Sequence, residues 1–114
     1  MTTINIVVET TEETKRRMKA ALRGQQQGFW YSFDTRSDLL RTLNPNRWAL
    51  IEALTGQGPM GVRELARRVD RDVKGVHTDA QALVLCGLIE KTEEGKLNFP
   101  YDAVHVDFTL NAAA

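Results

Sequence analysis

The stretch that decides the fold runs from Gly61 to Gly95 and reads GVRELARRVDRDVKGVHTDAQALVLCGLIEKTEEG. Its beginning places apolar residues at positions i, i+3, i+4 and i+7, the spacing of one helix face: Val62, Leu65, Ala66 and Val69. Residues 70–72 follow as a polar turn, in which Asp72 is suited to cap the next helix. The pattern therefore predicts two successive helices joined by a tight turn.

The second of these helices has an apolar and a polar face. With about 100° per residue, a continuous apolar face forms around Val76 from Val73, Ala80, Leu83, Val84 and Gly87. The side chains of Lys74, Thr78 and Gln81 are expected to point away from that face. Base edges in the major groove of DNA offer hydrogen-bond donors and acceptors, so cationic and small polar residues on such an outer face favour DNA reading.

The segments before and after these two helices supply a further helix and a hairpin. A helix that begins at Pro45 precedes the breaker 56–59, and its apolar residues are Trp48, Leu50, Ile51 and Leu54. After the second helix, short strands at 88–91 and 96–99 flank a turn that ends at Gly95. Residues 36–100 are therefore expected to form the core of an α+β winged helix-turn-helix, with the hairpin as its wing.

Three further strands are expected outside this core, at residues 2–9, 29–34 and 103–110. Together they can form one small sheet, either within the chain or across a dimer. Because exposed sheet edges invite pairing with another chain, we expect a homodimer. Residues 1–35 are assigned to an N-terminal strand-helix-strand dimerisation extension, and residues 101–114 to a C-terminal strand and tail.

The helix between the first two strands follows Thr10 and Thr11, either of which can cap it. It shows a thin apolar stripe, formed by Thr14, Met18, Ala21 and Leu22, and is otherwise basic. Residues 24–28 then make a polar break before the next strand. The basic face is interpreted as a solvated surface, with a phosphate-facing or toxin-facing helix as the alternative.

Composition is typical of one globular domain: 114 residues, of which 42% are hydrophobic and 26% charged. The single cysteine, Cys86, excludes an internal disulfide and favours a cytoplasmic location; it is expected to be a small buried or half-buried residue. The sequence has no apolar run long enough to predict a membrane span, and no basic leader that would predict a signal peptide. The net charge of zero suits a DNA binder poorly, although residues 1–87 hold 13 basic and 10 acidic side chains.

Several phrases of the chain match a known family: Leu43-Asn44-Pro45-Asn46-Arg47, Gly58-Pro59-Met60, Arg63-Glu64-Leu65-Ala66-Arg67, Arg71 to Asp79, Gly87-Leu88-Ile89-Glu90 and Pro100-Tyr101-Asp102. Over roughly residues 36–110, the chain resembles the small MarR-like winged-helix transcriptional regulators of bacteria and archaea. Many members of that family are encoded beside a small toxin and are interpreted as antitoxins. The resemblance implies sequence-specific binding of double-stranded DNA as a homodimer, often with autoregulation, and neutralisation of a cognate toxin as an extension.

The resemblance carries DNA contact over to Arg71, Lys74, His77 and Thr78. Combined with the outer face of the second helix, it gives a larger set of candidates. Lys74, Thr78 and Gln81 are expected in the major groove with His77 at its margin, and the backbone contacts are assigned to Arg63, Arg67, Arg71 and Lys96.

Two positions depart from the family's pattern. Gly61 stands where Ser or Thr would cap the helix before Glu64, so half of a capping box is lost. Gly75 stands in the first turn of the reading helix, where a polar side chain such as Asn would be expected. A glycine there lowers helix propensity by up to about 1 kcal/mol and removes a base contact, although it can permit close approach to a phosphate.

Several alternatives stay open. A half-buried His77 that anchors the helix is as consistent with the sequence as a DNA contact. Winged helices also serve as pure protein-docking modules, which a net charge of zero suits, and a ligand-sensing repressor would show a pocket beside Phe29, Trp30 and Tyr31. No catalytic motif, cofactor motif or metal-ligand spacing is present, and the acidic residues Asp70, Asp72 and Asp79 are explained by capping and by salt bridges to Arg67, Arg68 and Lys74.

Overall fold

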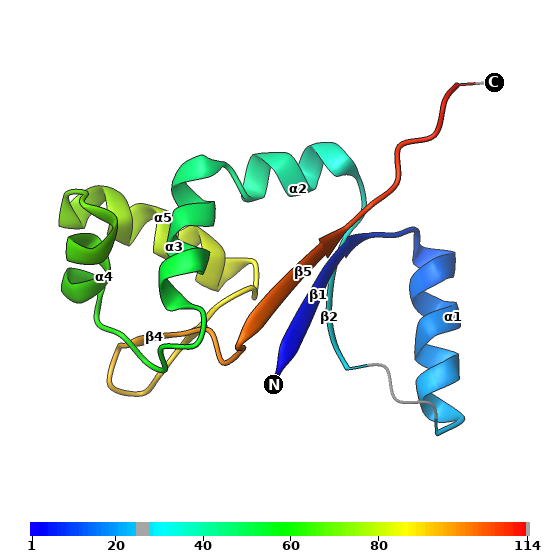
Figure 1. Ribbon diagram of the computed structural model, residues 1–114, viewed down its shortest axis with the longest axis horizontal. Helices are drawn as coiled ribbons and strands as arrows, with labels where there is room; N and C mark the ends of the chain where they lie inside the picture. Colours follow the sequence, from blue (N-terminus) through cyan, green and yellow to red (C-terminus); the bar gives the residue numbers. More distant parts are fainter. Residues whose placement is uncertain (25–27, 114) are drawn as a thin grey trace.

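The computed structural model describes residues 1–24 and 28–113, so residues 25–27 of the expected polar break lie outside it. In the described part, the chain has the mixed α+β fold that the sequence predicts (Figure 1). The elements in chain order are β1 (Thr3–Val8), α1 (Thr11–Leu22), β2 (Phe29–Phe33), α2 (Arg36–Thr42), α3 (Pro45–Leu54), α4 (Val62–Val69), α5 (Val73–Leu85), β3 (Glu90–Lys91), β4 (Leu97–Asn98) and β5 (Ala103–Asp107). Within that same part, no helix is both long and apolar enough to cross a bilayer.

The three strands outside the helical segment form one sheet within the chain. The order is β2-β1-β5, and both pairings are parallel. Ile4 of β1 lies opposite Phe29 of β2 on one side and Val104 of β5 on the other. The sheet lies between α1 on one side and the other four helices on the opposite side (Figure 1). The terminal strands are therefore neighbours although about one hundred residues separate them.

The helical segment is a second layer built on α3, α4 and α5, which pack against one another. Strands β3 and β4 form an antiparallel hairpin after α5. Met60, which precedes α4, adds an antiparallel bridge to Leu97 of β4, with both backbone hydrogen bonds at 2.8 Å. The hairpin is thereby tied to the start of α4 as well as to the end of α5.

One hydrophobic core joins the sheet to the helical layer. The side chains with no or almost no exposed surface come from both layers: Ile6, Leu50, Ile51, Leu54, Leu65, Val76, Leu83, Ile89 and Phe99. Ile4 and Ile6 on β1 pack in the same cluster as the helices. Because the apolar faces of α3, α4 and α5 are buried here, their hydrophilic faces are left outside.

The helix starts follow from local side-chain caps. Thr10 and Glu13 form a complete capping box on α1, and Thr35 caps α2 through the Asp38 N–H. Asn44 accepts a hydrogen bond from the Arg47 N–H and so caps α3. The expected starts of α1 and α3 are therefore confirmed.

Helix α1 has no buried residue, and Met18 and Leu22 of its apolar stripe are 59% and 87% exposed. Four expectations about exposure and extent are wrong. Val73 lies at the first turn of α5 beyond the core and is 36% exposed, and Gly87 lies outside the helix. Cys86 is exposed rather than buried. The last strand ends at Asp107 instead of extending to residue 110.

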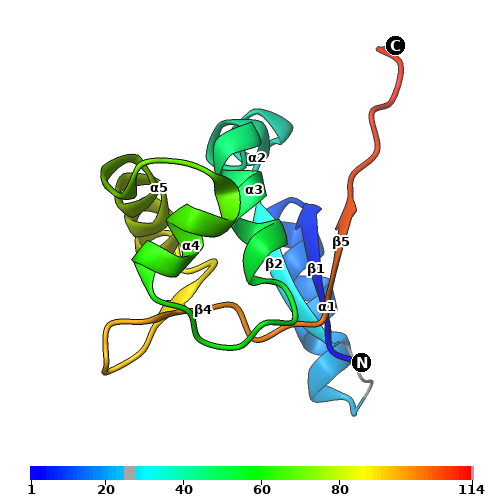
Figure 2. The ribbon, with the colours of Figure 1, turned by 60° about the vertical axis from the view of Figure 1, so that its left-hand side comes forward.

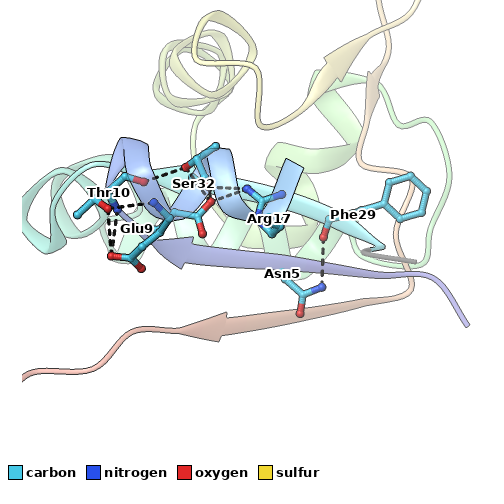
Figure 3. Close-up of polar contacts among 8 residues, drawn as sticks. Asn5, Glu9, Thr10, Arg17, Phe29 and Ser32 are labelled. Carbon is cyan, nitrogen blue, oxygen red and sulfur yellow. Dashed lines mark hydrogen bonds and ion pairs between the residues drawn. The ribbon is translucent and has the colours of Figure 1, made fainter. Parts of the chain in front are cut away.

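A partly buried polar network replaces apolar packing beneath α1 (Figure 3). Arg17 points from α1 toward the Glu9 carboxylate and the Ser32 hydroxyl, and its guanidinium lies 4.7 Å from the ring centre of Trp30. The hydroxyls of Ser32 and Thr14 donate to the same Glu9 oxygen. Burial raises the pKa of Glu9, but the hydrogen bonds from Arg17, Ser32 and Thr14 outweigh it and hold that pKa below the ordinary value.

Replacement of Glu9 by Gln tests this network. The loss of the carboxylate leaves Arg17 unpaired, and we expect the free energy of unfolding at neutral pH to fall by about 1–3 kcal/mol. Because folding lowers the pKa of Glu9, its contribution is present above the ordinary value of 4.5 and is lost as the pH falls through the folded pKa. Urea unfolding at neutral pH and at acidic pH should therefore show a difference between the two proteins that narrows in acid.

The matched control is Glu52→Gln, since Glu52 is exposed and forms no ion pair with any described residue. It should leave the unfolding free energy nearly unchanged at both pH values. Equal stability of Glu9→Gln and the unmodified chain at neutral pH would show that the network does not hold α1 to the sheet.

Candidate nucleic-acid interface

Helix α5 has a polar outer face opposite an inner face that is packed in the core. Val76, Ala80 and Leu83 are buried against α3 and α4, which fixes the rotation of the helix. Lys74, His77 and Thr78 are exposed on the other side. The Thr78 hydroxyl donates to the Lys74 carbonyl at 3.1 Å, so its oxygen lone pairs remain available as acceptors toward solvent.

The beginning of α5 is determined by Asp72 and Gly75. The Asp72 carboxylate accepts the Gly75 N–H at 2.9 Å, as expected of an N-cap. A Cβ at Gly75 would lie 3.0 Å from an Asp72 oxygen and 3.1 Å from an Arg71 nitrogen. The glycine therefore makes room for the cap and for the Arg71 side chain within the chain itself.

The turn between α4 and α5 depends on Asp70. This residue adopts a left-handed conformation with φ of 55°, which reverses the chain between the two helices.

Asp79 is the residue that ties α5 to its surroundings. Its two carboxylate oxygens lie 3.1 Å from Arg47 Nε and 3.0 Å from Arg71 Nη1. Arg47 lies in the first turn of α3 and Arg71 belongs to the turn before α5, so the aspartate links three segments. The side chain of Asp79 is only 15% exposed, and both arginines are about three-quarters buried. The expected pairing of Asp79 with Arg67, Arg68 or Lys74 is wrong.

Arg47 was not among the predicted site residues, although it lies in the phrase that carries the family resemblance. The signal available in the sequence was its position three residues after the helix cap Asn44. No local rule connects it to Asp79, which lies 32 residues further along the chain.

The cations assigned to the phosphate backbone differ in availability. Arg63, Lys74 and Lys96 are exposed and form no ion pair with any described residue. Arg67, by contrast, is paired with Glu64, which also binds Arg68 at 3.0 Å. The hydrogen bonds from Arg67 and Arg68 lower the pKa of Glu64.

Gln81 is half-buried, so the expectation that it points directly outward is wrong. It lines a small hollow of about 50 Å³ between α5 and the hairpin, together with His77, Val62, Ala80, Lys91, Gly95 and Leu97. His77 is exposed at the rim of this hollow, which places it between the outer face of α5 and the hairpin.

Aromatic residues of β2 contact other rings and the end of α5. Phe29 contacts Tyr101 edge to face at 5.4 Å between ring centres, and Tyr101 contacts Phe99 at 4.9 Å. The Tyr31 hydroxyl donates to the Cys86 carbonyl at 2.6 Å, which joins the sheet to the end of α5. Burial and the contact with Cys86 raise the pKa of Tyr31. Neither the hollow beside the hairpin nor the groove described below is lined by Phe29, Trp30 or Tyr31, the residues beside which a ligand-sensing repressor would show its pocket.

A larger open groove of about 630 Å³ lies at the carboxyl ends of the three parallel strands. Its walls come from the start of α1, the start of α2 and residues 107–111, and carry Glu9, Glu13, Asp34, Arg36 and Asp107 among others. Within the described ranges, no group of three or more His, Cys, Asp or Glu residues is placed to hold a metal ion.

Comparison with known proteins identifies a family. The chain belongs to the HVO_A0114 family, whose model matches residues 42–106 and thus runs from the end of α2 to β5. No curated protein matches the chain. The name of the family states no activity or ligand, so the MarR-like and antitoxin interpretations remain predictions.

Substitution of Asp79 by Asn tests the anchor of α5. The amide cannot balance two partly buried guanidinium groups, and we expect the free energy of unfolding to fall by about 1–3 kcal/mol in urea denaturation. The control is Asp38→Asn, whose exposed pair with Arg41 should contribute no more than about 0.5 kcal/mol. Equal effects of the two substitutions would contradict the anchoring role of Asp79.

Proposed function

We propose that the chain is a sequence-specific binder of double-stranded DNA that regulates transcription in the cytoplasm as a homodimer. In this proposal, α3, α4 and α5 are the three helices of a winged helix-turn-helix, and the hairpin β3–β4 is the wing. The observation that carries it is the outer face of α5, where Lys74 and Thr78 project from a helix whose rotation is fixed by core packing and by Asp79.

The order and packing of these elements support the proposal. The second helix of a helix-turn-helix lies in the major groove, with its N-terminal residues on base edges. Lys74 lies in the first turn of α5 and Thr78 one turn later on the same side. The Lys74 ammonium can donate to guanine O6 and N7, and the Thr78 oxygen can accept from an adenine or cytosine amino group.

The remaining cations supply backbone contacts in the proposed complex. Arg63 on α4 and Lys96 on the hairpin are exposed without an intramolecular carboxylate partner in the described chain. They lie on elements that flank α5, where phosphates on either side of a major groove would pass. Arg67 and Arg71 would have to exchange their carboxylate partners for phosphate, which reduces their expected contribution.

A protein-docking module is the second candidate, and a specific observation favours it. Arg67 and Arg71 are already paired with Glu64 and Asp79, and the exposed tip of the hairpin carries Glu93 and Glu94. These carboxylates reduce the positive charge of the surface around α5. A cognate toxin would be one partner for such a surface, as the resemblance to antitoxins implies.

The experiment that separates the two candidates is a salt series of binding to labelled DNA. The target is the region upstream of the coding sequence of the protein, and random DNA of equal length is the reference. DNA binding predicts tighter association with the upstream region and a steep linear fall of log affinity with log salt. Weak, equal binding to both DNAs would overturn the proposal and favour a protein partner.

Substitution of single residues on α5 tests the assigned face. Lys74→Ala should weaken operator binding roughly tenfold or more, and Thr78→Ala should weaken it less, because one contact each is lost on the base edges. Fluorescence anisotropy at fixed salt measures both, with unfolding in urea to show that the fold persists.

The matched control is Lys19→Ala, which removes the same charge from α1. That helix lies on the opposite side of the sheet from α5 (Figure 1), so operator binding should stay unchanged. An operator affinity for Lys74→Ala equal to that of the unmodified chain would contradict the assignment of this face.

A further inference from the structure

Strand β5 forms an unprotected edge of the sheet. Figure 2 shows it at the border, with β1 between it and β2. Proteins usually protect such edges with lysine or proline, yet residues 103–110 read AVHVDFTL and contain neither. Val106 on this edge is 39% exposed, and Phe108, which follows the end of the strand, is 40% exposed. A second strand added here would bury both side chains.

The direction of the free backbone groups on β5 follows from its first hydrogen bond. The Ala103 N–H donates to the Thr2 carbonyl at 3.0 Å, so Ala103 turns its backbone toward β1. Backbone groups alternate along a strand, and those of Val104 and Val106 therefore face away from β1. These outward N–H and C=O groups are the ones that a further strand would use.

The sequence of β5 is complementary to itself when a second copy lies antiparallel and a two-fold axis passes beside Val106. Val106 then lies opposite the partner's Val106, and Val104 lies opposite the partner's Phe108. Both are hydrogen-bonded pairs, in agreement with the outward backbone groups. His105 lies opposite the partner's Asp107 in the closely spaced, non-hydrogen-bonded position, twice by symmetry.

We propose that two copies of this chain pair along β5 in this register and form one six-stranded sheet, β2-β1-β5-β5-β1-β2. The inference rests on the homodimer of the proposed function and names its interface. The apolar side chains of Val104 and Val106 lie on the face that Ile4 and Ile6 share with the helical layer. His105 and Asp107 lie on the other face, that of α1, beside Asn5 and Val7.

The alternative register, centred one residue earlier on His105, fits less well. It uses the same outward backbone groups, but it places the two His105 side chains opposite each other and Asp107 opposite the partner's Ala103. The two His105–Asp107 pairs are lost, and two identical imidazole side chains meet instead. The register on Val106 is therefore the one that the side chains favour.

The register also accounts for a mismatch between sequence and structure. Apolar and polar residues alternate up to residue 110, yet β5 ends at Asp107, close to where β1 ends at Val8. In the paired dimer, Phe108 and Thr109 lie opposite the partner's Val104 and the partner's Ala103. The alternation thus continues where a second copy provides the partner strand.

A two-fold axis perpendicular to the sheet keeps equivalent faces on the same side. Both copies of α5 then lie on one side of the continuous sheet, and both copies of α1 lie on the other. This arrangement suits the two half-sites of a palindromic operator, which follow the two-fold symmetry of a dimeric reader.

Sedimentation velocity of the full chain over a range of concentrations tests the interface without DNA. The unmodified chain should associate to a dimer. His105→Asp should weaken dimerisation about tenfold, because each of the two cross-strand His–Asp pairs becomes a repulsive Asp–Asp pair. Adding Asp107→Lys to that variant should restore dimerisation, since the opposed charges are exchanged in the same register.

A second variant examines the backbone. Val106→Pro removes an outward N–H but no hydrogen bond to β1, so the fold should persist by circular dichroism while the dimer is lost. If Val106→Pro does not fold, the charge-exchanged pair still decides the question. A monomeric unmodified chain, or a dimer unaffected by His105→Asp, would overturn the proposal.

The two proposals fail in different ways. A dimer that follows these variants but does not bind DNA would contradict the proposed function and leave the interface intact. A monomer that binds its upstream DNA would overturn the interface and the homodimer but would leave the DNA-binding part of the proposed function intact. Lys74→Ala should remain dimeric, because Lys74 lies on α5, outside the edge.

Discussion

The arrangement of the whole chain depends on the central position of β1. Its backbone bonds β2 on one side and β5 on the other, and all three strands point in the same direction. Parallel neighbours require long crossover connections. The connection from β1 to β2 is α1, and the connection from β2 to β5 is the entire helical layer. That layer is therefore held on one face of the sheet at both of its ends, and α1 covers the opposite face.

Much of the fold could be predicted because its signals are local. The caps Thr10, Asn44 and Asp72 and the apolar spacing of α3 and α4 lie within a few residues of the structure that they determine. The direction of the strands could not be predicted in this way. Alternation identifies a strand but not its neighbour, and the pairing of residue 3 with residue 103 is decided by global packing. The exposure of the apolar stripe of α1 also depends on contacts between distant segments. Arg17 and Glu9, not Met18, connect that helix to the sheet.

The candidate site, like the fold, could be predicted only where the signal is local. A helical wheel is sufficient to place Lys74 and Thr78 outside, because it needs only the helix and its buried side. The same wheel placed Gln81 wrongly, because the hairpin that half-covers it belongs to a later segment. The ion-pair partners of Asp79 could not be predicted either. Ion pairs between segments depend on how helices cross, whereas the sequence favoured the nearer Arg67 and Arg68 over Arg47 and Arg71.

The sheet also has a consequence for the order in which a newly made chain can acquire its structure. Thr2 and Asp102 are hydrogen-bonded across 100 residues, so β1 is synthesised long before β5. Contacts of such separation close slowly, because the entropy of the intervening chain is lost first. The helical layer, with its short connections, can form while the ribosome is still at work. During that interval β1 has one bare side, and a nascent chain of this kind would benefit from early shielding by a chaperone.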